Sequence, residues 1–312
     1  MRGRAVAVAA YLAVLMMAGC RHVDRRKLVF IIVPSQDNPF FKAEADAAST
    51  EAQRLGYATR VDAHDDDAYR QDNLIDAAIA SNAAVIVLDN AGSDSSVSAV
   101  RRATQKGIPV FLIDREIETS GIAKAQIIAD NDQGARLVAG EFVRTLPATG
   151  DYAELLGRES DTNAQIRTKG FHAVLDGVAG LRLVSAQSAN WSQAEAFQKT
   201  ETMLQAHPSI AGIIAGNDTM ALGAAAAVKS AGLKNMKIVG FDGSPDAIAA
   251  IRMGELQATA LQPAVYIARL AVDEADRYLK TGSTGEKERQ IVPCDLVTKQ
   301  NALDYGNFEK LR

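Results

Sequence analysis

The sequence predicts an α/β protein of two similar lobes, each a doubly wound parallel sheet with helices on its faces. Short apolar runs alternate with longer amphipathic segments, which is typical of parallel strands joined by crossover helices. The alternation forms two successive series that meet near Asp130, and polar residues repeatedly follow the apolar runs. The 312 residues, 47% of them hydrophobic, are enough for two domains of about 100 to 150 residues each.

The N-terminus predicts export. Two arginines precede a continuous apolar run that ends in Gly-Cys at Cys20. This is the pattern of a signal peptide over residues 1–19, too short to span a membrane as a helix. The final Met-Ala-Gly-Cys also resembles a bacterial lipoprotein cleavage box, with methionine where leucine is usual. We therefore expect a lipid on Cys20 and a polar tether over residues 20–27.

The cysteines leave two arrangements open. The chain has one other cysteine, Cys294. Either Cys20 carries a lipid and Cys294 is a lone buried thiol, or the two form a disulfide. The cleavage box favours the first arrangement.

Composition argues against a nucleic-acid partner. The net charge is −4, and it becomes more negative once the two signal-peptide arginines are removed. A duplex-binding protein needs a basic face, and the only basic cluster is the short run over residues 25–27. The sequence has no second apolar segment long enough to span a membrane, so the body of the protein is expected to be exported and tethered at most by its end.

The first series begins at residue 28. Gly56 and Gly107 are the expected helix stops, because glycine readily adopts the conformation that ends a helix. Three aspartates, residues 65–67, lack the spacing of a calcium loop and are predicted to be a solvated helix cap. Strands are expected over residues 28–33, 57–63, 85–90, 109–115 and 126–130, and helices over 41–55, 68–81, 93–106 and 131–146.

The second series repeats the alternation, and its elements have similar lengths. Residues 281–287 form a Gly/Thr/Ser-rich surface loop, and residues 290–298 are an extended segment returning towards the junction. Strands are expected over residues 152–157, 181–188, 210–216, 237–241 and 257–262, and helices over 164–175, 192–207, 219–232 and 263–280.

Polar and aromatic residues follow the strands of both series. Ligands of open parallel sheets bind at the carboxyl ends of the strands, and aromatic faces beside amides and carboxylates suit a sugar. Plainer explanations stay open: the aromatics can fill the core, and a neighbouring Asp-Arg pair can be a surface ion pair. The strand-end candidates are Asn38, Phe40, Phe41, Asp114, Arg115, Trp191, Asn217 and Asp242.

With these strand ends in view, the sequence resembles the periplasmic sugar-binding proteins of bacterial ABC importers, in particular their ribose-binding and galactofuranose-binding branch. The match covers about residues 28–298 in the family's order. It is carried by Asn-Pro-Phe-Phe at 38–41, Gly-Ile-Pro-Val and Ile-Asp-Arg at 107–115, Asp-Asn at 130–131, Asn-Asp-Thr-Met-Ala-Leu-Gly-Ala at 217–224 and Val-Gly-Phe-Asp-Gly-Ser-Pro-Asp at 239–246.

The resemblance implies a type I periplasmic binding protein fold with a hinge of three crossings. The crossings are expected at residues 129–130, 262–263 and 295–296. The N-terminal lobe would hold residues 27–129 plus 263–295, and the C-terminal lobe residues 130–262 plus 296–312. Members of the family close the two lobes around one sugar.

The resemblance also assigns ligand-contacting positions. Ribose binders have serine at Pro34 and arginine at Gln165, although Arg167 matches another arginine of the family. Both Gln165 and Arg167 are kept as candidates. These departures favour another pentose, a furanose hexose or a polyol over ribose. The polar positions are Asn38, Asp114, Arg115, Asn217, Asp242 and Gln262, and the aromatic walls are Phe40, Phe41 and Trp191.

The expected function is the monomeric solute-binding component of an ABC importer, which delivers a sugar or polyol to separate permease and ATPase chains or presents it to a sensor. A repressor of the same fold would begin with a helix-turn-helix, where this chain has a signal peptide. A glycosidase-like pair, Asp114 and Asp242, is the enzymatic rival. No catalytic activity, cofactor or metal is expected, because the chain has no metal-ligand helix motif, Walker loop or nucleophile elbow. The histidines, at 22, 64, 172 and 207, are scattered and are expected at the surface or in caps.

Overall fold

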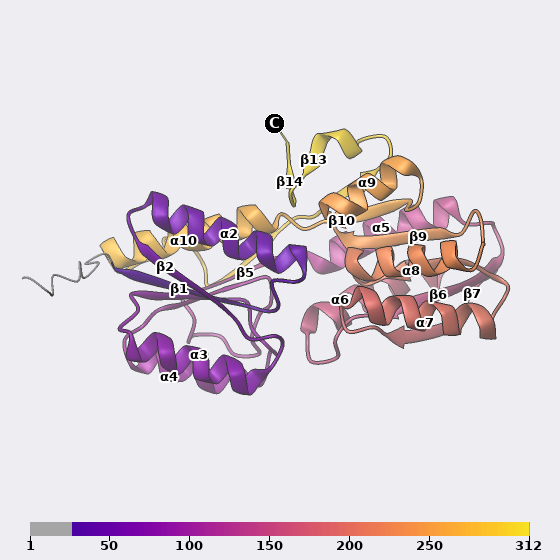
Figure 1. The fold of residues 1–312 in the computed structure, drawn as a ribbon. Helices are drawn as coiled ribbons and strands as arrows, with labels where there is room; N and C mark the ends of the chain where they lie inside the picture. Colours follow the sequence, from indigo (N-terminus) through magenta and orange to yellow (C-terminus); the bar gives the residue numbers. More distant parts are fainter. Residues whose placement is uncertain (1–26, 312) are drawn as a thin grey trace, which may run out of the picture.

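The computed structural model describes residues 27–311 (Figure 1). The predicted signal peptide, Cys20 and nearly all of the tether lie outside the described residues. The described part forms two α/β lobes side by side, each built on a six-stranded sheet. Within residues 27–311, no helix is both long and apolar enough to cross a bilayer.

The first lobe has an all-parallel sheet in the order β11-β5-β4-β3-β1-β2. Helices α2 and α10 pack together on one face, and α3 and α4 lie on the other (Figure 1). Every residue of β3 and β4 is buried, as expected for strands covered on both faces. The elements are β1 Leu28–Val33, α2 Pro39–Arg54, β2 Ala58–Ala63, α3 Ala68–Ala80, β3 Val85–Leu88, α4 Val97–Gln105, β4 Val110–Ile113, β5 Ala125–Ala129, α10 Ala264–Thr281 and β11 Arg289–Val292.

The second lobe has the strand order β12-β10-β9-β8-β6-β7, in which only the edge strand β12 runs antiparallel to its neighbour. Helix α5 packs on α6, and α7 packs on α8. The elements are α5 Asn131–Thr145, β6 Gly150–Leu156, α6 Thr162–Leu175, β7 Leu181–Ser188, α7 Gln193–Ala206, β8 Ile210–Ala215, α8 Asp218–Ser230, β9 Lys237–Asp242, α9 Pro245–Met253, β10 Ala258–Leu261 and β12 Asp295–Thr298.

The chain passes between the two sheets three times: after β5, after β10 and between β11 and β12. The third passage lies slightly earlier than the sequence suggests, because Asp295 already pairs with Leu261 in the second sheet. The extended segment predicted over residues 290–298 is therefore two strands belonging to different sheets.

The C-terminal residues include a small two-stranded sheet of their own. After β12 come the 3-10 turn η1 (Ala302–Asp304) and the two-stranded hairpin of β13 (Tyr305–Gly306) and β14 (Glu309–Lys310). Figure 1 shows this hairpin above the junction of the lobes, where β13 and η1 contact α9 and β14 contacts α10.

The fold class expected from the sequence is confirmed, with one helix missed. The pattern predicts strands β1–β10 in order but gives no helix between β9 and β10, where α9 lies. Ser244 caps α9 by accepting a hydrogen bond from the Ala247 amide at 3.2 Å, and Gly254 ends it with φ 81°. A serine followed by proline is a helix start, but the helix is only nine residues long.

Candidate ligand site between the lobes

A small cavity of about 20 Å³ lies where the carboxyl ends of the two sheets face each other. A wider hollow of about 640 Å³ shares Asn38, Phe41 and Trp191 with it and leads to solvent between the lobes. The cavity is lined by Asn38, Phe40, Phe41, Asp114, Arg115, Asp161, Asn163, Arg167, Trp191, Asn217, Asp242 and Gln262. Ten of the eleven residues predicted from the sequence are therefore brought together here.

The start of α2 forms one wall of the cavity. Asn38 caps the helix, with its Oδ1 accepting a hydrogen bond from the Phe40 amide at 3.0 Å, and Pro39 occupies the first helical position. This cap fixes Phe40 and Phe41 on the first turn, where their rings meet edge to face with centroids 5.6 Å apart. Both rings are buried and line the cavity.

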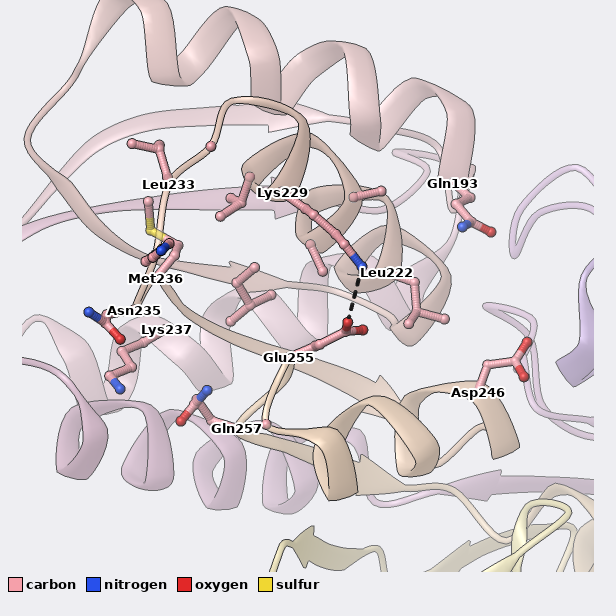
Figure 2. A pocket seen from close by; sticks show the side chains of 17 residues that line it. Gln193, Leu222, Lys229, Leu233, Asn235, Met236, Lys237, Asp246, Glu255 and Gln257 are labelled. Atoms are coloured by element: carbon pink, nitrogen blue, oxygen red, sulfur yellow. Dashed lines mark ion pairs between the residues drawn. The ribbon is translucent and has the colours of Figure 1, made fainter.

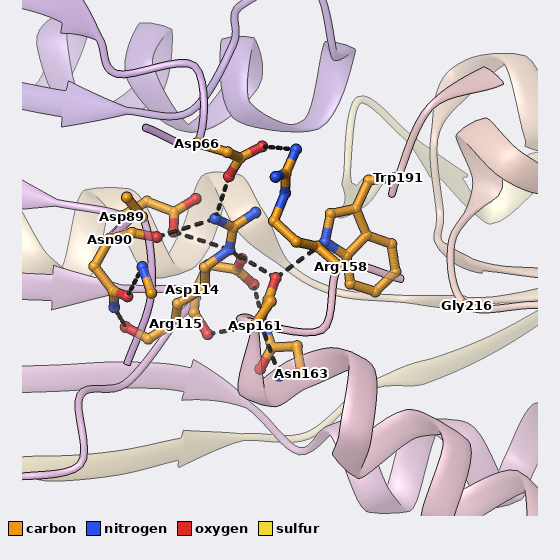
Figure 3. Close-up of polar contacts among 12 residues, drawn as sticks. Asp66, Asp89, Asn90, Asp114, Arg115, Arg158, Asp161, Asn163, Trp191 and Gly216 are labelled. Carbon is orange, nitrogen blue, oxygen red and sulfur yellow. Dashed lines mark hydrogen bonds and ion pairs between the residues drawn. The ribbon is translucent and has the colours of Figure 1, made fainter. Parts of the chain in front are cut away.

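Arg115, which follows β4, is the electrostatic centre of the first lobe (Figure 3). Its guanidinium lies 5.0 Å above the Phe41 ring and is 2% exposed. Four carboxylates surround it, at 2.8 Å for Asp66, 2.8 Å for Asp161, 3.5 Å for Asp89 and 3.8 Å for Asp114. Burial acts to lower the pKa of Arg115, but these carboxylates together raise it well above its usual value. The cation is therefore permanent.

Asp161 and Asn163 reach this group from the second lobe. Besides its ion pair with Arg115, Asp161 accepts a hydrogen bond from the Trp191 indole N–H at 3.1 Å. The Asn163 amide donates to Asp114 Oδ1 at 3.2 Å. Both residues are 3% exposed. The two lobes are thus joined across the cavity by an ion pair and a hydrogen bond.

Arg167, on α6, is the corresponding cation of the second lobe. Its Nε donates to Asn131 at 2.7 Å, and its Nη1 donates to the Gly216 carbonyl at 2.8 Å and to Asp242 at 3.1 Å. The guanidinium stacks 3.9 Å from the centre of the Phe241 ring. The hydrogen bonds and the stacking contact together hold the guanidinium group of Arg167 in one orientation.

Asp242 and Gln262 stand at the ends of β9 and β10. The Gln262 amide donates to Asp242 Oδ1 at 2.9 Å, while Gln262 Oε1 is buried and accepts no hydrogen bond from residues 27–311. Asn217 caps α8 through the Met220 amide at 2.9 Å. A buried acceptor without a donor costs about 1 to 3 kcal/mol, so Gln262 offers a favourable position for a ligand hydroxyl.

Two of the three carboxylates that line the cavity, Asp114 and Asp242, have raised pKa values. Burial raises the pKa of Asp114 to about 7, against the lowering effect of Arg115. Burial likewise raises the pKa of Asp242 to about 6, although Arg167 opposes it. Each carboxyl is therefore protonated more readily than an aspartate in water, and each has oxygens that can accept hydrogen bonds from sugar hydroxyls.

Trp191 closes the far wall of the cavity. It has φ 65° and its ring lies directly against Gly157, where a Cβ would stand 2.0 Å from Trp191 Cη2. The absence of a side chain at Gly157 therefore leaves the space that the indole ring occupies. Arg167 lies 5.4 Å from the indole, so Trp191 connects the cation of the second lobe to Asp161.

A family model described as "Periplasmic binding protein domain" matches residues 29–284. The chain belongs to this family.

Curated relatives place the protein close to several periplasmic binding proteins. The D-apiose import binding protein of Paraburkholderia graminis is 55% identical over 90% of this chain and 90% of its own, and that of Actinobacillus succinogenes is 52% identical over 90% and 91%. The ribose import binding protein of Escherichia coli is 32% identical over 87% and 90%. Among solved structures, the Caulobacter myo-inositol binding protein bound to myo-inositol has a TM-score of 0.83 and 27% identity, covering 92% of this chain and 97% of its own. The family expected from the sequence is confirmed.

Gln165 is the one predicted site residue that the structure does not bring to the cavity. Its side chain is exposed on α6 and donates to the Glu159 carbonyl at 3.2 Å. Because Arg167 is two residues further along the same helix, the two side chains point in different directions, and only Arg167 faces the cavity.

One expectation about the surroundings is wrong, and another holds only in part. His64 is fully buried and bonds the Asp89 carbonyl at 2.8 Å; burial lowers its pKa to about 4, so it is a neutral core residue. Among the three consecutive aspartates, Asp67 caps α3 as expected, but Asp66 turns away to pair with Arg115. Neither contact could be read from local spacing, since each joins segments distant in sequence.

Asp161 and Asn163 are the site residues that sequence reasoning missed. Asp161 caps α6 by accepting from the Asn163 amide at 2.9 Å, so an Asp before a helix was the available signal. It marks a helix start but does not say that the side chain also reaches the other lobe.

Another hollow lies along the second lobe (Figure 2) and shares Gln193, Leu222 and Asp246 with the wider hollow between the lobes. It measures about 690 Å³ and lies between the end of α8 and the turn from α9 to β10, where Lys229 pairs with Glu255 at 3.5 Å. None of the predicted site residues lines it. It has no aromatic wall and no buried cation, and so does not offer what a sugar needs.

Proposed function

We propose that this periplasmic binding protein is the solute-binding component of an ABC importer and that it captures D-apiose, or a pentose of similar shape, between its lobes. The observation that carries the proposal is the convergence on one aromatic-walled cavity of two fixed guanidinium groups, three carboxyl groups and Gln262 Oε1, which accepts no hydrogen bond from residues 27–311. Sugar hydroxyls both donate and accept hydrogen bonds, and the cavity offers guanidinium donors together with carboxyl and amide acceptors.

The ligand class follows from the chemistry of the cavity and from the relatives. D-apiose is a neutral branched pentose that closes to a five-membered ring, and the two relatives above 50% identity are named for its import. A buried site with more carboxylates than guanidinium groups disfavours anionic sugars such as aldonates, because an added negative charge would be unpaired.

Binding requires movement of the lobes. A cavity of about 20 Å³ has room for about one water molecule, which is less than a pentose needs. The pair of Arg115 and Asp161 must therefore lengthen, and the lobes must separate to admit the sugar and close over it. Family members use such hinge closure, and the three passages between the sheets are the proposed hinge.

The remaining assignments are delivery and anchoring. We propose that a separate permease receives the sugar from the closed form, that the protein acts as a monomer without catalytic activity, and that a lipid on Cys20 holds it at the membrane. The wild-type protein should incorporate a labelled fatty acid when it is made in growing cells, and Cys20→Ser should not. Absence of the label from the wild-type protein, or equal labelling of both, would contradict the lipid anchor.

The experiment uses the single tryptophan of the chain. The mature protein is titrated with D-apiose, D-ribose, L-arabinose and myo-inositol while Trp191 emission is followed, and each result is repeated by calorimetry. We expect saturable binding of D-apiose with Kd of about 1 μM or tighter, near −8 kcal/mol, and weaker binding of the others. Absence of heat with every compound would overturn the proposal. In Trp191→Phe the emission signal should vanish, while calorimetry shows whether binding persists.

A further inference from the structure

The C-terminal hairpin connects the second lobe to the first. The segment leaves β12 of the second sheet, and its Ala302 and Tyr305 belong to the apolar core of the second lobe. Its other strand, β14, contacts α10 of the first lobe, and Glu309 pairs with Arg269 of that helix at 3.3 Å. The hairpin therefore rests on both lobes near their junction (Figure 1).

The tip of the hairpin has an unusual residue. Asn307 and Phe308 connect the strands with φ 48° and 58°. Two consecutive residues of positive φ are typical of the tight hairpin turn that favours Asn followed by Gly. Asn307 fits this turn, but a bulky phenylalanine in the left-handed region is strained. Such strain persists only where the surrounding structure enforces it, often at functional positions.

The side chain of Phe308 explains why the turn tolerates it. Asn307 is exposed, whereas Phe308 is 1% exposed. Its ring meets the ring of Phe40 edge to face, with centroids 5.5 Å apart and planes at 88°. Phe40 meets Phe41 in the same manner, and Phe41 lies beneath the Arg115 guanidinium. A continuous row of contacts thus runs from the hairpin tip to the cation of the cavity.

We propose that Phe308 is a positioning residue for ligand binding, which holds Phe40 at the cavity wall and ties that wall to the second lobe through the hairpin. Phe308 does not line the cavity itself, so it acts through Phe40. The proposal rests on the proposed function in taking the cavity as the sugar site. It adds that the last residues of the chain help to determine affinity.

The binding test compares Phe308→Ala with a matched aromatic truncation, Phe142→Ala. Phe142 is equally buried and meets Tyr152 edge to face at 6.0 Å, but it does not line the cavity. Phe308→Ala should weaken D-apiose binding about tenfold, which corresponds to the interaction energy of one aromatic pair. Phe142→Ala should lower the melting temperature and leave Kd unchanged. If Phe142→Ala does not fold, Phe142→Leu takes its place. Unchanged Kd in Phe308→Ala would overturn the proposal.

A double-mutant cycle separates positioning from general destabilisation. If Phe308 acts through Phe40, then adding Phe308→Ala to Phe40→Leu should not weaken binding further. Full additivity of the two changes would contradict the proposed route.

A measurement without ligand distinguishes failure of this proposal from failure of the sugar assignment. The amides of Phe40 and Lys42, in the first turn of α2, donate to the Asn38 side chain and carbonyl, and their hydrogen exchange should accelerate in Phe308→Ala and not in Phe142→Ala. If the wild-type protein binds no D-apiose but exchange responds as expected, the ligand assignment fails and the contact between Phe308 and Phe40 stands. If exchange does not respond, the positioning role fails.

Discussion

Arg115 Nε and Asp161 Oδ2 lie 2.8 Å apart and join the two lobes across the cavity. Removing one partner of a buried pair leaves the other charge poorly compensated, so the closed form should lose stability. Asp161→Asn should therefore weaken D-apiose binding by at least about tenfold, as measured by calorimetry. Glu159→Gln, the same change at an exposed position of the same loop, should leave Kd unaltered. Equal affinity in both variants would show that the pair does not contribute to closure.

Arg167 should not be replaceable by lysine. Its planar guanidinium serves Asn131, the Gly216 carbonyl and Asp242 at once, and the compact ammonium of lysine cannot reproduce that fork. Arg167→Lys is expected to weaken binding about a hundredfold. Arg182→Lys, at an arginine whose side chain is 74% exposed on β7, is the control and should bind as the wild type does. If Arg167→Lys bound D-apiose as tightly as the wild type, only the positive charge at this position would matter for binding.

Gly157 is needed for the position of Trp191. A methyl group there would stand 2.0 Å from the indole, so Gly157→Ala must push Trp191 out of place. Overpacking of this kind costs about 1 to 3 kcal/mol, and we expect roughly tenfold weaker binding with altered tryptophan emission. Gly140→Ala, on α5 with no atom within 4 Å of its added Cβ, should leave both unchanged. Identical emission from the two variants would contradict the contact.

Stability should fall as pH rises from 6.5 to 8. Burial raises the pKa of Asp218 to about 8 and that of Asp114 to about 7, above the value of 3.8 expected in the unfolded chain. The folded protein therefore holds more protons in this window, and its free energy of unfolding decreases with pH. Hydrogen bonding to Glu154 raises the pKa of His172 to about 9, which acts in the same direction. His64, with pKa lowered to about 4, loses its contribution only below pH 6.5.

Asp218→Asn isolates one of these groups. It should flatten the pH dependence of urea unfolding by about 1 to 2 kcal/mol between pH 6.5 and 8. His172→Gln measures the histidine separately. A pH dependence that is unchanged in Asp218→Asn would show that this carboxyl does not hold its proton in the folded protein.

The fold could be predicted from the sequence because the signals that mark each helix and strand are local. Apolar runs, glycine stops and capping residues mark each strand and helix, and two series of them imply two lobes. Asn38 and Asn217 could be found for the same reason, since each follows a strand and begins a helix. The residues at strand ends converge because parallel strands end at one edge of a sheet.

What the sequence could not supply are contacts between segments far apart in the chain. The pairing of Asp66 with Arg115 and the packing of Phe308 on Phe40 depend on how elements are placed in space. Gln165 and Arg167 could not be told apart by resemblance alone, because the choice depends on which side of α6 faces the cavity. Short α9 was missed since its cap and proline occur where a strand end was also expected.

The route of the chain between the sheets also bears on how the protein is made. The first sheet acquires its edge strand β11 and its covering helix α10 only from residues beyond 263, after the whole of β6–β10. A polypeptide that emerges N-terminus first therefore cannot complete its first lobe until nearly all of it has emerged. Contacts of such long sequence separation form slowly. The interleaved order of segments thus makes completion of the first lobe, and of the cavity between the lobes, depend on the arrival of the C-terminal residues.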